Sequence, residues 1–425
     1  MNLCRKIAWA GRRPAWSEGA AGIRPFPAGR RLLAALIVAG LAGCASTPPL
    51  RIPLDRGPAE QTERAAANRA VFERVWQLVA DRHFDAKLGG LDWRALGEQH
   101  GPRAIAAADE AGLYRVLNAM LAPLNDSHTH ALTPARAAER RSRVRARTGF
   151  NLTRIDDRWV VTEVLAGSPA EQAGIKPGWI VVARNGVPLG ERFDFRPKAG
   201  EAAVWEFLDE ADHPVRLAPA AQPLSTAPRR VMRALEGGFV YLRFDEFNGQ
   251  GRRWLSQQLK EHHQAPGVVI DLRQNPGGET ISLGIAIGEF FDHAVDCGTF
   301  IKRGGSRSLK NSWQLGSANY RGKVVVLVAG ATGSAAEIFA AVLQDHGRAT
   351  IVGRRTAGAV LASWFYQLPD GGQLQLSRED YLAPKGRRIE GKGLEPDVPV
   401  NRTLAEVRTG RDWDLEAALA ILARP

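Results

Sequence analysis

The segment that most constrains the fold of this 425-residue chain is residues 323–345. An apolar run, Val324–Val328, leads through a loop of small residues into a helix pattern that begins at Ala335. A strand, a tight loop and a helix in direct succession are typical of α/β layer folds. The loop ends in Ser334, at the predicted helix N-terminus, where free amides and the helix dipole favour negative charge.

Ser334 has two possible roles. A serine before a helix can be an N-cap, and Glu337 stands three residues later, at the spacing of a capping box. A serine at such a turn is also well placed to act as a nucleophile beside an oxyanion hole. Taken alone, this segment leaves both roles open.

Alternating strand and helix patterns surround this segment. Strands are predicted over residues 239–244, 268–272, 324–328 and 350–352, and helices over 281–291 and 335–344. They predict an α/β domain over residues 235–405 with a largely buried sheet, followed by a C-terminal helix over 406–425. Apolar residues at helical spacing predict a small helical domain over residues 59–135: Phe72, Val75, Trp76 and Val79, then Leu113, Val116, Leu117, Met120 and Leu121.

The segment over residues 148–220 has a strand-rich pattern. Residues 150–155 and 159–164 read as strands, Ser168 and Pro169 as the start of a short helix, and Asn185-Gly186 as a turn. The segment resembles a PDZ domain, with Gly149 and Phe150 where that family has its carboxylate-binding loop. The resemblance implies that the C-terminus of a peptide binds there as an added strand. The alternative is a β-rich spacer that binds nothing.

Residues 1–43 have the features of an export signal. A basic stretch precedes the apolar run Leu32–Leu41, which is too short to span a bilayer comfortably. The run ends in Leu41-Ala42-Gly43-Cys44, which resembles the lipobox of bacterial lipoproteins and implies acylation of Cys44; the alternative is an ordinary signal peptide. Residues 44–58 are rich in proline and suit an extended tether. This places the protein at the bacterial cell envelope, lipid-anchored and facing the periplasm, most simply on the outer membrane.

Charge and cysteine content narrow the functions further. The signal segment carries seven basic residues and one acidic residue, so its removal takes away about half of the +12 formal charge. The arginines that cluster at 136–147 are expected on a solvated helix end or linker, and no nucleic-acid partner is predicted. With Cys4 removed and Cys44 acylated, Cys297 is left alone, which predicts buried packing and no cysteine-based metal site.

Three further segments bear on Ser334: Asp271–Gly278, Leu124–His130 and Ile389–Val398. With the PDZ-like segment and the order of the parts, they resemble the family of tail-specific, C-terminal-processing and tricorn-core serine peptidases over roughly residues 60–405. The resemblance implies a catalytic domain of the ClpP/crotonase type. It also implies that Ser334 is the nucleophile, and that the amide of Ala335, with that of Gly277 or Gly278, forms the oxyanion hole.

The general base separates two branches of this family. One branch uses a lysine where this chain has Ala359, which cannot accept a proton. The other, tricorn-like branch uses a Ser-His pair and a late glutamate, matched here by Ser127, His128 and Glu390. In that reading Ser127 bonds the imidazole of His128 and is itself held by Glu390. His130 is the nearest rival as base, and His346 is expected to cap the nucleophile helix.

The resemblance implies an exported serine endopeptidase that cleaves peptides or unfolded proteins through an acyl-enzyme, without a metal or cofactor. Two alternatives remain open. A PDZ-bearing binding protein whose catalytic domain has decayed would lack a working base, so His128 is the discriminating residue. An esterase-type acyl hydrolase would use the same site on simple esters.

Overall fold

The computed structural model describes residues 63–190, 197–315 and 318–425. The predicted signal segment, Cys44 and the tether lie outside the described residues. Among the described residues, no helix combines the length and the apolar character needed to cross a membrane.

A six-stranded sheet forms the centre of the catalytic region. Its strand order is β10-β11-β12-β15-β16-β19, parallel throughout except for β10, which pairs antiparallel with β11 at the edge. Five consecutive residues of β12 are buried, as expected for a strand covered on both faces. The strands are β10 (Arg230–Ala234), β11 (Val240–Phe244), β12 (Gly267–Asp271), β15 (Lys323–Val328), β16 (Thr350–Gly353) and β19 (Val398–Pro399).

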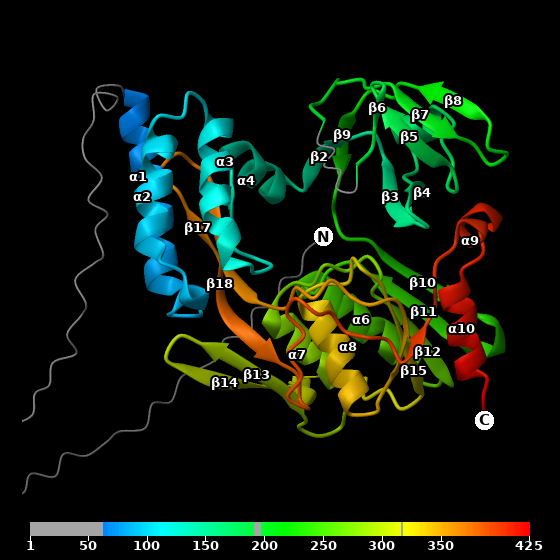
Figure 1. The fold of residues 1–425 in the computed structure, drawn as a ribbon. Coiled ribbons are helices and arrows are strands. Elements are labelled where there is room, and N and C mark those ends of the chain that lie inside the picture. Colours follow the sequence, from blue (N-terminus) through cyan, green and yellow to red (C-terminus); the bar gives the residue numbers. More distant parts are fainter. Residues whose placement is uncertain (1–62, 191–196, 316–317) are drawn as a thin grey trace, which may run out of the picture. The chain divides into compact units, whose positions relative to one another are not determined.

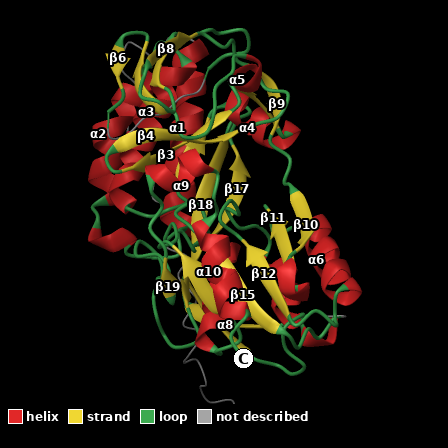
Figure 2. Ribbon diagram, turned by 90° about the vertical axis from the view of Figure 1, so that its right-hand side faces the viewer, coloured by secondary structure: helices red, strands yellow, loops and turns green. Residues whose placement is uncertain are grey.

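Helices cover both faces of this sheet. Val268 and Ile270 pack toward α6 (Gly249–Glu261), α7 (Thr280–Gly288) and α8 (Ala335–Asp345), whereas Val269 packs toward α10 (Trp413–Leu422). Figure 2 shows β11, β12 and β15 between α10 and α6. This alternation follows from the period of two along a strand, and it confirms the predicted α/β fold.

The C-terminal region differs from the prediction of one helix over residues 406–425. Two helices form, α9 (Leu404–Thr409) and α10. Gly410 ends α9 in the left-handed conformation, and the carboxylate of Asp412 then caps α10 by accepting the N–H of Leu415 at 3.1 Å.

The helical segment contains α1 (Glu63–Arg82), α2 (Trp93–Ile105) and α3 (Glu110–Leu121) (Figure 1). The predicted apolar stripes lie in its core, which also contains Leu374 and Leu376 from a second sheet. Residue 135 therefore does not separate two hydrophobic cores. The second sheet consists of β1 (His130–Leu132), β13 (Asp296–Lys302), β14 (Gly305–Lys310), β17 (Ala362–Gln367) and β18 (Gln373–Leu382), with β18 pairing with β1, β13 and β17.

The PDZ-like unit follows α4 (Pro134–Ser142). Ser168 caps α5 (Pro169–Gln172) as predicted, and the Asn185-Gly186 turn has positive φ at both residues. The first strand, β3, is an edge strand, and the described residues between β6 and β7 form no helix. The strands are β3 (Phe150–Ile155), β4 (Arg158–Val164), β5 (Ile180–Arg184), β6 (Val187–Pro188), β7 (Trp205–Leu208) and β8 (Pro214–Leu217), with β2 (Val144–Arg147) and β9 (Gln222–Ser225) paired beside them.

Candidate active site

Ser334 lies at the turn from β15 into α8 in a conformation that is rare for a residue with a side chain, with φ 51° and ψ −123°. Such backbone strain costs on the order of 1–3 kcal/mol and persists only where the surroundings impose it. The Ser334 N–H donates to Ala359 O at 2.8 Å and to Glu337 Oε2 at 3.1 Å. Its amide is therefore already engaged, and Glu337 caps the helix from the position that the sequence indicated.

Glu337 does more than cap the helix. Its fully buried carboxylate also accepts the amides of Gly358 at 2.7 Å and Ala359 at 2.8 Å, and the hydroxyl of Thr356. Burial raises the pKa of Glu337, although these hydrogen bonds act in the opposite direction. This one side chain thus connects the turn at Ser334 to the loop over 356–359, where a lysine would be expected in the other branch of the resembling family.

Gly277 packs directly against the turn that carries Ser334. At Gly277, an added Cβ would lie 2.5 Å from the Cβ of Ser334, so this position accepts no side chain without displacement. The Gly277 N–H donates to Asn275 Oδ1 at 2.9 Å. Among the hydrogen bonds of the described residues, none uses the N–H of Gly278 or of Ala335.

The segment before β1 brings the predicted base to this place. Ser127 Oγ lies 2.6 Å from His128 Nδ1, and the main-chain N–H of Ser127 donates to Glu390 Oε1 at 3.0 Å. The second oxygen of Glu390 accepts the amide of Val360 at 2.9 Å. Glu390 therefore holds Ser127 through its main chain and not through its hydroxyl. Burial lowers the pKa of His128, although the nearby carboxylate of Asp126 raises it.

His128 and Ser334 line the same pocket, of about 470 Å³, together with Gly278 and Ala335. Among the hydrogen bonds of the described residues, the ring of His128 bonds Ser127 and none joins it to Ser334. Catalytic hydrogen bonds are often long before substrate binds. The remaining walls of the pocket are mostly apolar and include Leu283, Phe300, Ile338, Val360, Leu361, Trp364 and Phe365.

The other histidines considered lie elsewhere. His130 is in β1, paired with Gln375 of β18, and does not line the pocket. His346 is the C-cap residue of α8, as predicted, and its Nε2 lies 2.7 Å from Asp296 O. Cys297 is fully buried in the main core, and burial raises its pKa to about 12.

Sequence reasoning missed the surroundings of the base loop. Asp126 was noted only as part of a motif, and His83 was not noted at all, yet His83 Nε2 lies 2.9 Å from Asp126 Oδ2 and both side chains are buried. Burial favours a raised pKa for Asp126, but hydrogen bonds from His83, Thr129 and Ser377 outweigh it and hold the pKa well below its usual range. The 43 positions between the partners leave no local signal.

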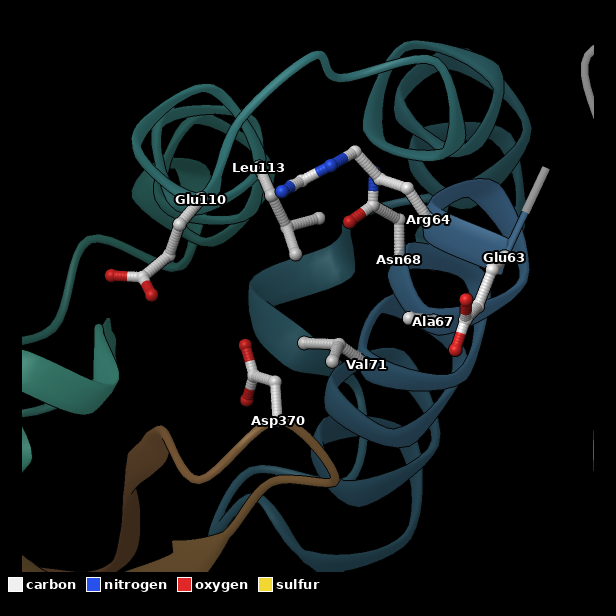
Figure 3. Close-up of a pocket in the computed structure, with 8 residues that line it drawn as sticks. All are labelled: Glu63, Arg64, Ala67, Asn68, Val71, Glu110, Leu113 and Asp370. Atoms are coloured by element: carbon white, nitrogen blue, oxygen red, sulfur yellow. The ribbon is translucent and has the colours of Figure 1, made fainter.

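Other hollows lie outside this pocket among the described residues, and two of them differ clearly in their lining. One, of about 640 Å³, is shared by the PDZ-like unit and the catalytic region and is lined by Arg147, Asn151, Leu165 and Pro276 among others; Pro276 also lines the active-site pocket. The other, of about 390 Å³, lies among α1, α3 and the turn between β17 and β18, where Arg64, Glu110 and Asp370 contribute side chains (Figure 3). No histidine, serine or cysteine lines that second hollow. Within the described ranges, no group of three or more His, Cys, Asp or Glu residues is arranged to hold a metal ion.

The described architecture combines a ClpP/crotonase-like α/β unit with a PDZ-like unit, and it gives the fold class of the protein. Comparison with known proteins then gives the family. The profile of Peptidase family S41 matches residues 238–400, and that of the Tricorn protease C1 domain matches residues 64–122. Residues 238–400 therefore form a peptidase domain of family S41, and the chain is a serine peptidase.

Individual relatives agree with this assignment. The chain is 28% identical to a carboxyl-terminal-processing protease of Synechocystis over 368 residues. The aligned region covers 82% of this chain and 85% of that protein. It is 24% identical over 396 residues to putative tricorn protease homolog 2 of Streptomyces coelicolor, covering 85% of this chain and 32% of that protein. The solved photosystem II D1 C-terminal processing protease shares the fold, with a TM-score of 0.58 and 23% identity, over 84% of this chain and 98% of that one.

Proposed function

We propose that this peptidase is an exported endopeptidase that cleaves peptides or unfolded proteins at Ser334, with His128 as general base. The observation that carries the proposal is that one pocket is lined by both side chains and by Gly278, although His128 lies 150 positions before Gly278 and 206 before Ser334. The 2.6 Å contact between Ser127 and His128 supports the same reading, because a base needs a second group to orient its ring.

In the proposed mechanism, His128 Nε2 accepts the hydroxyl proton of Ser334 while Oγ attacks the scissile carbonyl carbon. This requires the tautomer in which Nδ1–H donates to Ser127 Oγ, so that the lone pair of Nε2 is free. The protonated imidazole then gives its proton to the leaving amine, which departs and leaves an ester on Ser334. A water molecule, deprotonated by His128, hydrolyses that ester and restores the serine.

The negative charge that develops on the carbonyl oxygen needs two donors. Ala335 N–H and Gly278 N–H have no partner among the described residues, whereas Gly277 N–H is engaged by Asn275. We therefore assign the oxyanion hole to the amides of Ala335 and Gly278. Gly277, which has no side chain, allows the glycine turn to lie close to the turn at Ser334. Donors of this kind contribute on the order of 10²- to 10³-fold each in kcat.

Recognition of substrate C-termini is assigned to the PDZ-like unit. Its β3 is an edge strand that begins at Phe150, directly after Gly149, and an edge strand can accept an extended peptide. Phe150 is buried against Trp205, so its amide and not its ring would meet the peptide. Arg147 lines the adjacent hollow and donates to Asn151 without a carboxylate partner among the described residues, so a terminal carboxylate would suit it.

The export signal and the acylation of Cys44 belong to the same proposal. They rest on the apolar run and the Leu-Ala-Gly-Cys sequence alone. Metabolic labelling with a palmitate analogue tests them: the wild type should be labelled and sediment with membranes, and Cys44→Ser should lose both. Equal labelling of both forms would refute lipidation at this residue.

A fluorophosphonate probe tests the catalytic assignment, with hydrolysis of an unfolded protein such as casein as the second readout. Wild type should be labelled and should cleave casein, while Ser334→Ala and His128→Ala should lose labelling by more than about 10³-fold. His130→Ala serves as the matched histidine control and should keep activity. No labelling of the wild type would favour a decayed binding protein. Turnover of simple esters without casein cleavage would favour an esterase.

A further inference from the structure

The loop that carries the proposed base is held by a buried carboxylate. Asp126 Oδ1 accepts the main-chain N–H of His128 at 3.0 Å and that of Thr129 at 2.6 Å, and Oδ2 accepts the hydroxyl of Thr129 at 2.7 Å. Ser377 Oγ, from β18, donates to Oδ1 at 2.9 Å. The carboxylate therefore fixes the backbone at His128 itself and at the residue after it.

The remaining partner of this carboxylate comes from the end of α1. His83 follows α1 directly, is 3% exposed, and places Nε2 at 2.9 Å from Asp126 Oδ2. The N–H of Asp85 donates to His83 Nδ1 at 3.2 Å. Nδ1 also lies 3.2 Å from the carbonyl oxygen of Asp85, and since the carboxylate of Asp126 accepts, the Nε2–H of His83 donates to it.

His83 is in turn held against the catalytic region. Arg303, in the turn between β13 and β14, donates to Ala80 O at 2.7 Å and to His83 O at 3.3 Å. The N–H of Phe84 donates to Ser377 O at 3.2 Å. The histidine is thus fixed from the side of β13, β14 and β18 while it contacts the base loop.

We propose that His83 is a positioning residue for catalysis, acting through Asp126 to hold the main chain at His128. The proposal rests on the proposed function, since it assigns His83 to the positioning of that base. Loss of His83 leaves a buried carboxylate with one donor fewer, so the loop that this carboxylate holds can shift. Displacement of a catalytic group by about 1 Å can cost on the order of 10²-fold in rate.

His83→Ala and His83→Gln test this role, because glutamine keeps an N–H donor. His100→Ala is the matched control: His100 is another buried histidine of the helical segment, 7% exposed, in α2. The first readout is hydrogen exchange of a peptic peptide covering residues 125–130. Exchange should rise at least tenfold in His83→Ala, stay within threefold of wild type in His83→Gln, and not change in His100→Ala.

The second readout is the rate of fluorophosphonate labelling at Ser334. It should fall by about 10- to 100-fold in His83→Ala and recover in His83→Gln. Unchanged exchange in His83→Ala, an equal rise in His100→Ala, or faster exchange with normal labelling would each overturn the positioning role. If the wild type is not labelled at all, the proposed function fails, whereas exchange still decides whether His83 holds the loop.

Discussion

Gly277→Ala tests whether the close approach of the glycine turn to Ser334 is required for catalysis. A Cβ at this position would lie 2.5 Å from the Cβ of Ser334, 2.8 Å from Ala335 N and 2.9 Å from Gly333 O, where ordinary contact begins at 3.4 Å. The nucleophile turn or the glycine turn must therefore move by about 1 Å, and either movement separates the proposed oxyanion donors. We expect kcat to fall by about 10²- to 10³-fold, equivalent to about 2.7–4 kcal/mol.

Gly347→Ala provides the control for this substitution. Gly347 also has positive φ, at 63°, but an added Cβ would meet nothing within 4 Å. Both variants place alanine at positive φ, which costs on the order of 1 kcal/mol at the 63° of Gly347 and more at the 109° of Gly277, and only Gly277→Ala adds the clash. Casein hydrolysis, fluorophosphonate labelling and thermal melting are measured together. If folded Gly277→Ala keeps kcat within threefold of Gly347→Ala, the argument for the oxyanion hole is wrong.

Three other predictions concern the site and its surroundings. The proposed base is the neutral form of His128, and burial lowers the pKa of this histidine, so kcat/KM should stay high just below pH 6.5 and fall only at more acidic pH. An acid limb at or above pH 6.5 would contradict this. Arg147→Ala should raise KM about tenfold for peptides with a free C-terminus and leave amidated peptides unchanged, whereas equal effects on both would exclude a carboxylate contact. Glu337→Gln places an amide group among N–H donors. The free energy of unfolding, measured by urea titration, should therefore fall by about 1–3 kcal/mol, and activity should fall at least tenfold. Normal stability would refute the role of Glu337.

Much of the fold could be predicted because its signals are local. The strand at 150–155, the cap at Ser168 and the helix that begins at Ala335 each depend on neighbouring residues, and each appears where predicted. The strands β17 and β18 were not predicted. Leu374 and Leu376 in β18 belong to the same hydrophobic core as the residues of α1–α3. These core partners lie far away in the sequence, so residues near β18 alone do not reveal the contact.

The candidate site shows the same division. Family resemblance suggested Ser127, His128, Ser334 and Glu390. The structure brings Ser127, His128 and Glu390 together and places His128 and Ser334 on one pocket. The family resemblance could not predict the positive φ of Ser334, the contact of Glu390 with the main chain of Ser127, or the His83–Asp126 pair. Each of these depends on tertiary contacts between residues 43 or more positions apart, or on strain imposed by them.

The two C-terminal helices have a consequence for motion within the enzyme. Val407 of α9 packs with Ile155, Val160 and Ile180 of the PDZ-like unit, while Leu422 of α10 packs on the central sheet. Three residues connect the two helices, so the end of the chain links the PDZ-like unit to the central sheet through a short connection. A rotation of the PDZ-like unit away from the central sheet would have to separate α9 from β3, β4 and β5 or change the backbone angles of the connection at Gly410. Substitution of Gly410 by a residue with a side chain would restrict that second route.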